Sequence, residues 1–271
     1  MATAVARYTA AALTDRGRKR ASNEDAFGYS VEHGIYLVCD GMGGAAAGEI
    51  ASALAIEEVL RLVTERLDAR PDASRDTHPE PSGSQSTSLI PQIAREAVAA
   101  ANEAIHSRGQ RNPRLSGMGT TLVGVLAGQS EADSRVWVLN VGDSRCYRLR
   151  QGRIEQISHD HSLVDEQVRM GRMTRAEAAR SPMRNVITRA LGTQPSVTPD
   201  VFEMEIEPGD LFLLCSDGLT RDLSDEKLEC ILSTPGSTLP PLEELCSCLI
   251  QAANKAGGHD NITCLLVRAE V

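Results

Sequence analysis

The sequence predicts an α+β fold in which antiparallel sheets are covered by layers of helices. Several strand-length apolar runs follow one another without a helical segment between them, which favours antiparallel pairing. These runs are 34–39, 120–127, 135–141, 146–149, 154–157, 210–215 and 262–267, and 150–153 has the composition of a hairpin turn. Longer segments with helical periodicity precede, separate and follow the runs, so we expect helical layers over the sheets.

Three segments carry apolar residues at the spacing of a long amphipathic helix. They are 48–67, 89–108 and 241–256, and Gly109 is a candidate C-cap for the second. Shorter helices are predicted at 162–170, 175–180 and 225–232, and Thr174 with Glu177 forms a capping-box pattern at the start of the 175–180 helix.

The composition is that of an ordinary globular protein and argues against several function classes. Apolar residues make up 41% of the 271 residues and charged residues 24%, which allows a sizeable core. A net charge of −9 and an aromatic content of 3% argue against binding to nucleic acid or to anionic membranes. No apolar run reaches the roughly 18 residues of a membrane span, and no signal-peptide pattern is present. We therefore expect a cytoplasmic protein.

One segment differs from the rest of the chain in composition. Residues 68–88 are rich in Pro, Ser, Asp and Thr and contain no Leu, Ile, Val or aromatic residue. Such a segment cannot pack into a core, so we expect a flexible surface loop between two helices. We expect residues 1–271 to form a single domain around it.

The cysteines predict free thiols. The chain has seven, an odd number, and no C-x-x-C pair. Cys39, Cys215 and Cys264 lie inside apolar runs. Buried, reduced thiols therefore explain them better than disulfides or a zinc site.

Four aspartates lie at the ends of apolar strands. Asp40, Asp143 and Asp217 each follow a predicted strand, and Asp260 precedes the strand at 262–267. Carboxylates gathered at one sheet edge repel each other, and a hard cation such as Mg²⁺ or Mn²⁺ relieves that repulsion. An Asp-Gly step also commonly marks a turn, so these residues alone leave the metal-site and turn interpretations both open.

The segment before the first of these strands carries a second charged pattern. Arg20 offers a planar fork that can bind phosphate oxygens, and Glu24, four residues later, could join a hard-metal site. Taken alone, this pattern also fits a solvated charged loop.

The motifs together identify a family resemblance that runs over nearly the whole chain. They are RASNED at 20–25, VCDGMGG at 38–44, GE at 48–49, GMGTT at 117–121, VGDSR at 141–145, DHSLV at 160–164, NVITRALG at 185–192, CSDGL at 215–219 and HDNIT at 259–263. In this order they resemble the metal-dependent protein serine/threonine phosphatases of type 2C, in their bacterial form. The resemblance implies a four-layer sandwich, with two packed antiparallel sheets flanked by helices on both sides.

The resemblance also implies two Mn²⁺ or Mg²⁺ ions at one end of the sandwich. By motif, Asp40 bridges the two ions, Glu24 and the Gly41 carbonyl serve one of them, and Asp217 and Asp260 hold the other. Many bacterial relatives bind a third, weaker ion, for which Asp143 and Asp217 match.

Further residues match the reaction itself. Arg20 matches the arginine that grips the substrate phosphate, and Asn261 is a supporting partner of the ligands. The implied reaction is attack of a metal-activated water on phosphoserine or phosphothreonine, with Arg20, Asp40 and Asp217 as catalytic residues. Met42 stands where many eukaryotic members have a histidine that is proposed as general acid. His159 and His161 are near in sequence only, and we interpret both as loop-packing or helix-capping residues.

The resemblance suggests partners and one alternative. We expect phosphorylated proteins and a cognate serine/threonine kinase as partners, and a monomer. The arginines between 153 and 184 could attract acidic phosphopeptides, or they could form a solvated helical face. The alternative function is a catalytically inactive, phosphatase-like binding module. The presence of all five matching carboxylates disfavours it.

Overall fold

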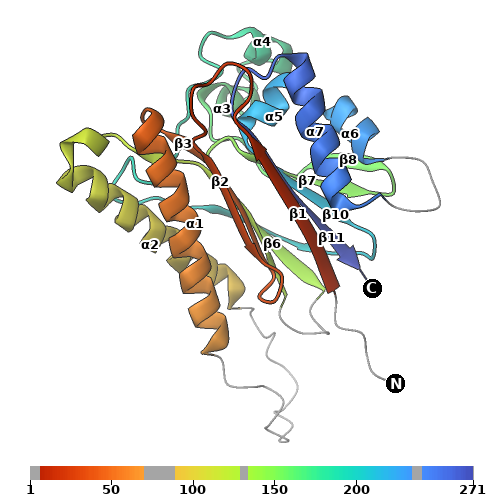
Figure 1. The fold of residues 1–271 in the computed structure, drawn as a ribbon, viewed down its shortest axis with the longest axis horizontal. Coiled ribbons are helices and arrows are strands. Elements are labelled where there is room, and N and C mark those ends of the chain that lie inside the picture. The colour runs from red at the N-terminus through yellow and green to blue at the C-terminus, as the bar shows by residue number, and fades with distance from the viewer. Residues whose placement is uncertain (1–6, 70–88, 129–133, 234–239, 271) are drawn as a thin grey trace, which may run out of the picture.

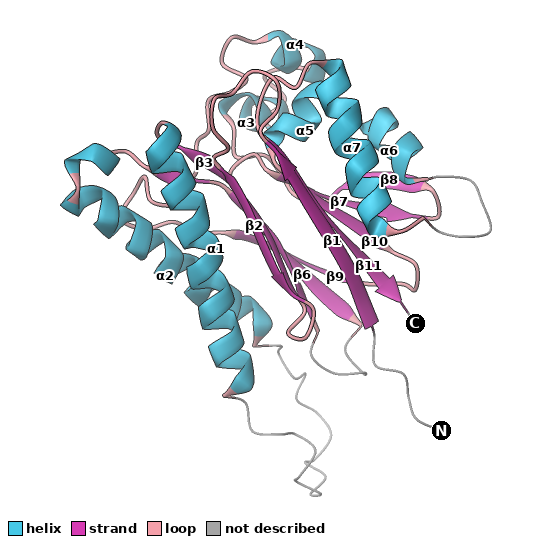
Figure 2. Ribbon diagram, viewed as in Figure 1, coloured by secondary structure: helices cyan, strands magenta, loops and turns pink. Residues whose placement is uncertain are grey.

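The computed structural model describes residues 7–69, 89–128, 134–233 and 240–270. Its strands form two antiparallel sheets (Figures 1 and 2). Sheet I has the strand order β1 (Arg7–Asp15), β11 (Ile262–Glu270), β10 (Leu211–Cys215), β7 (Arg145–Arg150) and β8 (Arg153–Gln156). Sheet II has the order β2 (Asp25–Ser30), β3 (Ile35–Met42), β5 (Leu122–Ala127), β6 (Arg135–Val141) and β9 (Asp200–Glu205), and β4 (Gly119–Thr120) also pairs with β3.

Helices cover the outer face of each sheet, and Figure 2 shows the resulting layers. Sheet II is covered by α1 (Ala45–Asp68) and α2 (Ile90–Arg111), and the 3-10 turn η1 (Pro113–Leu115) follows α2. Sheet I is covered by α5 (Asp217–Asp222), α6 (Asp225–Leu232) and α7 (Leu242–Ala256). Two short helices, α3 (Leu163–Arg169) and α4 (Arg175–Arg180), lie beyond the end of the sheets (Figure 1).

Alternation along the strands builds three apolar cores. In β3, Ile35 and Leu37 pack against α1 and α2, whereas Tyr36 and Val38 face the other sheet. Successive side chains of a strand point to opposite faces, so a strand in a middle layer must be apolar on both. The core between the sheets includes Val38, Val123, Phe212, Leu214 and Leu265. The predicted four-layer sandwich is thereby confirmed.

Several expected elements are found with small shifts, and two short helices lie at their expected bounds. Helices α4 and α6 coincide with 175–180 and 225–232, and the predicted capping box of α4 is present. The prediction that Gly109 ends the second helix was wrong, because α2 continues to Arg111 and is capped at Asn112. A single glycine costs a helix only about 1 kcal/mol, which the packed face of α2 outweighs.

The sequence patterns missed three strands and one helix. The missed elements are β1, β2, β9 and α5. The alanine-rich β1 and the mixed β2 and β9 lack a strong apolar run, and pairing to β11, β3 and β6 forms them instead. Residues 70–88, most of the expected loop, lie outside the described residues, but helices flank the segment as expected. Arg66 of α1 pairs with Glu96 of α2 at 2.8 Å.

Two further expectations concern the cysteines and the membrane. All seven cysteines are free, and Cys39, Cys215 and Cys264 are buried, as predicted. In the described ranges, no helix is both long enough and apolar enough to cross a lipid bilayer.

Candidate active site

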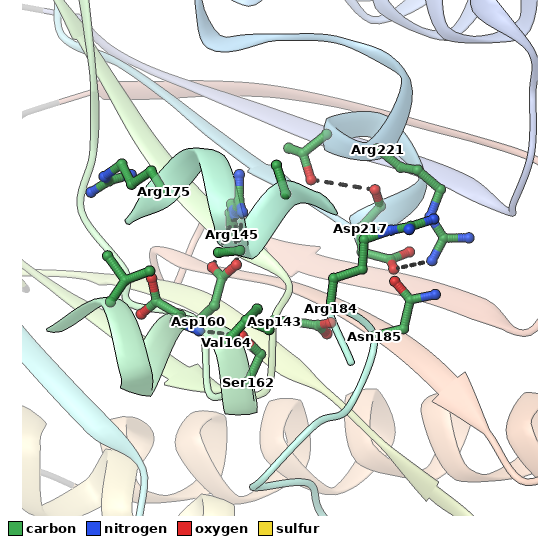
Figure 3. Close-up of a pocket in the computed structure, with 15 residues that line it drawn as sticks. Asp143, Arg145, Asp160, Ser162, Val164, Arg175, Arg184, Asn185, Asp217 and Arg221 are labelled. Carbon is green, nitrogen blue, oxygen red and sulfur yellow. Dashed lines mark hydrogen bonds and ion pairs between the residues drawn. The ribbon is translucent and has the colours of Figure 1, made fainter. Parts of the chain in front are cut away.

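Antiparallel pairing brings the strand-end aspartates to one end of the sandwich. Asp40 lies near the end of β3, and Asp217 begins α5 just after β10 ends. Asp143 lies in the turn between β6 and β7, and Asp260 comes shortly before β11. Asp143 and Asp217 line the same pocket (Figure 3). The expected convergence of these four residues is therefore present.

The carboxyl groups are close enough to change each other's ionisation. Those of Asp40 and Asp217 are hydrogen-bonded to each other. Burial raises the pKa of Asp40 well above its usual range, and the charges of Asp25, Asp217 and Asp143 raise it further. Burial, followed by the charge of Asp217, raises the pKa of Asp143 to about 7. A buried group of mutually repelling carboxyls is costly unless protons, arginines or a cation neutralise it.

Two arginines neutralise part of this group. Arg20 forms a two-pronged pair with Asp260, with Nε 2.7 Å from Oδ1 and Nη2 2.7 Å from Oδ2. Arg221 of α5 reaches Asp260 Oδ2 at 2.7 Å and Asp217 Oδ2 at 2.8 Å. Arg20 thus lies at the predicted site with a half-exposed side chain, and Asp260 rather than open solvent faces its fork.

The donor set fits a hard divalent cation in chemistry and charge. All candidate side-chain ligands are carboxylates, and oxygen donors select Mg²⁺ or Mn²⁺. Asp25 Oδ1 is buried without a hydrogen-bond partner, as expected next to a cation. As they stand, no three His, Cys, Asp or Glu side chains in the described residues are arranged to hold one ion. Asp217 and Asp260 would have to exchange arginine contacts for the metal.

Glu24 and Gly41 lie against each other, as two ligands of the same ion must. The Gly41 N–H donates to the Glu24 carbonyl at 3.2 Å. A Cβ at Gly41 would overlap the carbonyl oxygens of Glu24 and Gly48, and a Cβ at Gly48 would overlap the Glu24 carboxylate. Only glycine at both positions lets the backbone approach this closely.

Asn261 holds the loop that carries Arg20 and Glu24. Its Oδ1 accepts from the Glu24 N–H at 2.9 Å, and its Nδ2 donates to the carbonyls of Arg16 and Ser22 at 3.0 and 2.8 Å. The side chain is buried and uses its acceptor and both donors. Asn261 therefore acts on the site through the backbone of the 16–24 loop.

The sequence reasoning assigned no role to Asp25, which forms part of the site. It pairs with Asp40 across β2 and β3, and its Oδ2 accepts from Ser216 Oγ and Thr263 Oγ1, both at 2.7 Å. Despite these two hydrogen bonds, burial raises the pKa of Asp25 to about 7. The residue lies in the RASNED motif, but its strand was not predicted.

The GMGTT motif fixes the backbone of Asp40. Thr120 Oγ1 donates to the Asp40 carbonyl at 2.9 Å, and Thr121 Oγ1 accepts from the Asp40 N–H at 2.9 Å. Thr121 Oγ1 also lies 2.6 Å from Ser144 Oγ, next to Asp143. These hydroxyls join the β3 end to the β6–β7 turn, a role that the motif alone did not indicate.

The nearby histidines pack loops, as predicted. His159 meets Phe202 edge-on, with 5.4 Å between ring centroids. His161 is buried, its Nδ1 accepts from the Gly142 N–H at 3.1 Å, and its Nε2 lies 3.2 Å from Asp200 Oδ2. Its Nδ1 thus has a hydrogen-bond partner within the fold, whereas its buried Nε2 lies near Asp200 without a well-directed hydrogen bond.

Similarity to known proteins agrees with this geometry. The family model described as Protein phosphatase 2C matches residues 14–266. The "Serine/threonine phosphatase stp" of Listeria welshimeri is 37% identical over 257 residues, which cover 94% of this chain and 93% of that protein. The "Serine/threonine protein phosphatase PstP" of Mycobacterium tuberculosis is 40% identical over 263 residues, covering 96% of this chain but 44% of that longer protein.

Solved structures show the same fold. A crystal structure of the M. tuberculosis serine/threonine phosphatase PstP/Ppp has a TM-score of 0.81 at 35% identity, covering 98% of this chain and 100% of that one. The PstP catalytic domain solved with two manganese ions has a TM-score of 0.79 at 34% identity, covering 98% and 99%. The chain therefore belongs to the protein phosphatase 2C family, a family of hydrolases that act on phosphoproteins.

Proposed function

We propose that this protein is a serine/threonine phosphatase that hydrolyses phosphoserine and phosphothreonine with a water activated by two divalent ions. The observation that carries the proposal is the buried group of carboxyls at one end of the sandwich, where Asp40 and Asp217 share a hydrogen bond. Burial raises the pKa of both Asp40 and Asp143, and the charge of Asp217 raises each of them further. An ion pair that only stabilises a fold joins opposite charges and does not require several carboxyl groups beside one another.

The ligand assignment follows the motifs and the contacts. Asp40 would serve both ions, Glu24 and the Gly41 carbonyl would serve one, and Asp217 and Asp260 would serve the other. Asp143, beside Asp217, is available for a third and weaker ion. When bound, Mn²⁺ or Mg²⁺ lowers the pKa of a water and stabilises negative charge on the phosphoryl oxygens.

The chain's own residues orient the reaction. The guanidinium fork of Arg20 suits two phosphoryl oxygens and offsets the charge that develops on them. Asn261 keeps the Arg20–Glu24 loop in place, and Asp25 ties the two sheets together beneath Asp40. The Met42 side chain has no proton to donate, so the leaving oxygen must take its proton from water or from another residue.

The two thiols nearest the site argue against a cysteine nucleophile. Burial raises the pKa of Cys215 to about 12, and burial also raises the pKa of Cys39. A nucleophilic cysteine needs a lowered pKa so that the thiolate is present near neutral pH. Both cysteines instead pack against helices in the outer cores.

The names of the relatives support a proposal for the cellular role. Several are bacterial serine/threonine phosphatases, which supports a role in reversing the action of a serine/threonine kinase. We further propose that the protein acts in the cytoplasm, as a monomer, and opposes a cognate kinase. Its substrates are then phosphorylated proteins.

The test is hydrolysis of matched phosphoserine, phosphothreonine and phosphotyrosine peptides by the purified chain. We expect activity toward the first two with Mn²⁺ or Mg²⁺, and none in EDTA. A folded protein that binds phosphopeptides but releases no phosphate with either metal would support the inactive binding module instead.

A further inference from the structure

Four arginines line the pocket beside the predicted metal ligands. The pocket has a volume of about 340 Å³, and Asp143 and Asp217 form part of its wall (Figure 3). The arginines come from β7, from α4 and the segment after it, and from α5: Arg145, Arg175, Arg184 and Arg221. A pocket of this size can accept a few side chains of a bound peptide.

Two of the four arginines are already paired with aspartates. Arg145 donates from Nε and Nη2 to both carboxylate oxygens of Asp160, at 2.9 and 2.7 Å. Arg221 bonds to Asp217 and Asp260. Charge-assisted pairs of this geometry are strong, so the guanidinium group of Arg145 is committed to Asp160. The guanidinium group of Arg221 is held by the two predicted metal ligands and would leave them when they bind a metal.

The other two arginines are open to a ligand. Arg175 begins α4, Arg184 follows that helix, and both are exposed. Within the described ranges, neither side chain makes an ion pair or hydrogen bond with another residue. The neighbouring acidic residue of the pocket, Asp165, lies 3.2 Å from Arg169.

The charge around this pocket differs from that of the whole chain. Residues 169–189 contain six arginines and a single acidic residue, Glu177, whereas the chain carries a net charge of −9. Glu177 is used in the cap of α4, where its carboxylate accepts from the Thr174 N–H at 2.8 Å. The segment is therefore a local positive field on an acidic protein, which attracts anionic groups to this pocket.

We propose that Arg175 and Arg184 bind acidic side chains next to the phosphorylated residue, so that the enzyme prefers phosphopeptides with Asp or Glu on that side. The inference rests on the proposed function, because the phosphate must reach Asp143 and Asp217 in the same pocket. Small apolar side chains of α3 and α4 line the pocket between the helices and can receive the aliphatic part of the peptide: Val164, Val168, Ala178 and Ala179.

The test compares kcat/KM for phosphothreonine peptides of equal length. One peptide has neutral flanks, two have acidic residues before or after the phosphothreonine, and one has basic flanks. We expect an acidic peptide to exceed the neutral one by about tenfold at low salt, as two exposed ion pairs allow. The preference falls as the salt concentration rises, because exposed charges are screened.

Variants assign the preference to the pocket. In Arg175→Gln/Arg184→Gln we expect the acidic-to-neutral ratio to fall close to one, and in Arg175→Glu/Arg184→Glu the basic peptide becomes the better substrate. The matched control is Arg172→Gln/Arg180→Gln, which removes the same charge from exposed residues outside the pocket and keeps the wild-type ratio.

The outcomes separate this inference from the proposed function. Equal hydrolysis of acidic and neutral peptides by the wild type would overturn the inference and leave the function standing. An equal loss of preference in the control would also overturn it, since general charge would then explain the effect. If the metal-loaded wild type hydrolyses none of the peptides, the proposed function itself is wrong.

Discussion

Asp25 and Asn261 support the candidate metal site without needing to touch a substrate. Asp25 lies on sheet II and bonds to Ser216 and Thr263 of the sheet I side, so one carboxyl joins the two sheets beneath Asp40. Asn261 joins the start of β11 to the loop that carries Glu24. Partners of this kind orient a site as strictly as its ligands do.

Replacing Asn261 should weaken both the fold and metal binding. In Asn261→Ala the Glu24 N–H and two carbonyls lose their partner, so we expect the free energy of unfolding to fall by about 1–3 kcal/mol. The affinity for Mn²⁺ should fall about tenfold, because Glu24 loses its fixed position. Urea unfolding in EDTA and calorimetric titration with Mn²⁺ measure the two effects.

Asn102 provides the matched control. It is a buried asparagine of α2 that bonds to the Gly192 N–H and the Gln194 carbonyl, and it contacts no predicted metal ligand. Asn102→Ala should be destabilised to a similar extent and keep the Mn²⁺ affinity of the wild type. If Asn261→Ala kept the Mn²⁺ affinity of the wild type, Asn261 would have no role in positioning the metal ligands.

Among the secondary-structure elements, α1 sets the distance between the site and the 68–88 segment. The helix starts three residues after Met42, the end of β3, and its 24 residues span about 36 Å. Its far end therefore lies remote from Asp40. The direct packing of α1 on α2, with the Arg66–Glu96 pair, holds the two helices together without the connection.

Shortening the connection between these helices should leave catalysis intact. We expect a variant with 70–88 replaced by a shorter Gly/Ser linker to keep kcat and KM for a phosphothreonine peptide within about twofold of the wild type, since surface loops tolerate such changes. Steady-state kinetics on the two proteins checks this. A large loss of kcat in a linker variant that still melts cooperatively would give the segment a catalytic role.

Local patterns located individual helices better than strands. The period and the Thr174–Glu177 box placed α4 correctly, because these signals act within a few residues. Strand β1 escaped prediction because its partner β11 is distant in sequence and its own residues are only weakly apolar. Strand β2 pairs with the next strand, β3, but its own residues are also too weakly apolar to mark a strand. Asp25 was missed with β2, since the register across from Asp40 makes it a site residue.

At the scale of the whole molecule, the antiparallel topology gathers the site from five parts of the chain. The sequence placed Asp40, Asp143, Asp217 and Asp260 at strand ends, and the order of the motifs predicted that they converge. The pairing of Arg221 with Asp217 and Asp260 could not be predicted, because it depends on how α5 lies against the residues just before β11.

The buried carboxyl of Asp143 should make the free energy of unfolding depend on pH when the metal is removed. The folded pKa of Asp143 is about 7, above the unfolded value of about 4, so the folded state binds more protons between these pH values. The contribution of Asp143 to the free energy of unfolding therefore falls as the pH rises from about 4 to about 7. An asparagine at this position cannot ionise.

The measurement is urea unfolding in EDTA across this pH range. We expect the wild type to lose stability relative to Asp143→Asn as the pH rises, and excess Mn²⁺ to reduce that difference. If the free energy of unfolding changed with pH in the same way for both proteins in EDTA, the pKa of Asp143 would not be raised in the folded state.

The central claim is tested most directly by measuring Mn²⁺ binding and phosphothreonine-peptide hydrolysis on the wild type and on Asp217→Asn. Glu226→Gln is the control, because it removes an exposed carboxylate of α6 away from the site. We predict that Asp217→Asn loses Mn²⁺ affinity and nearly all activity, and that Glu226→Gln keeps both. Activity that survives EDTA and the Asp217→Asn change would contradict the account.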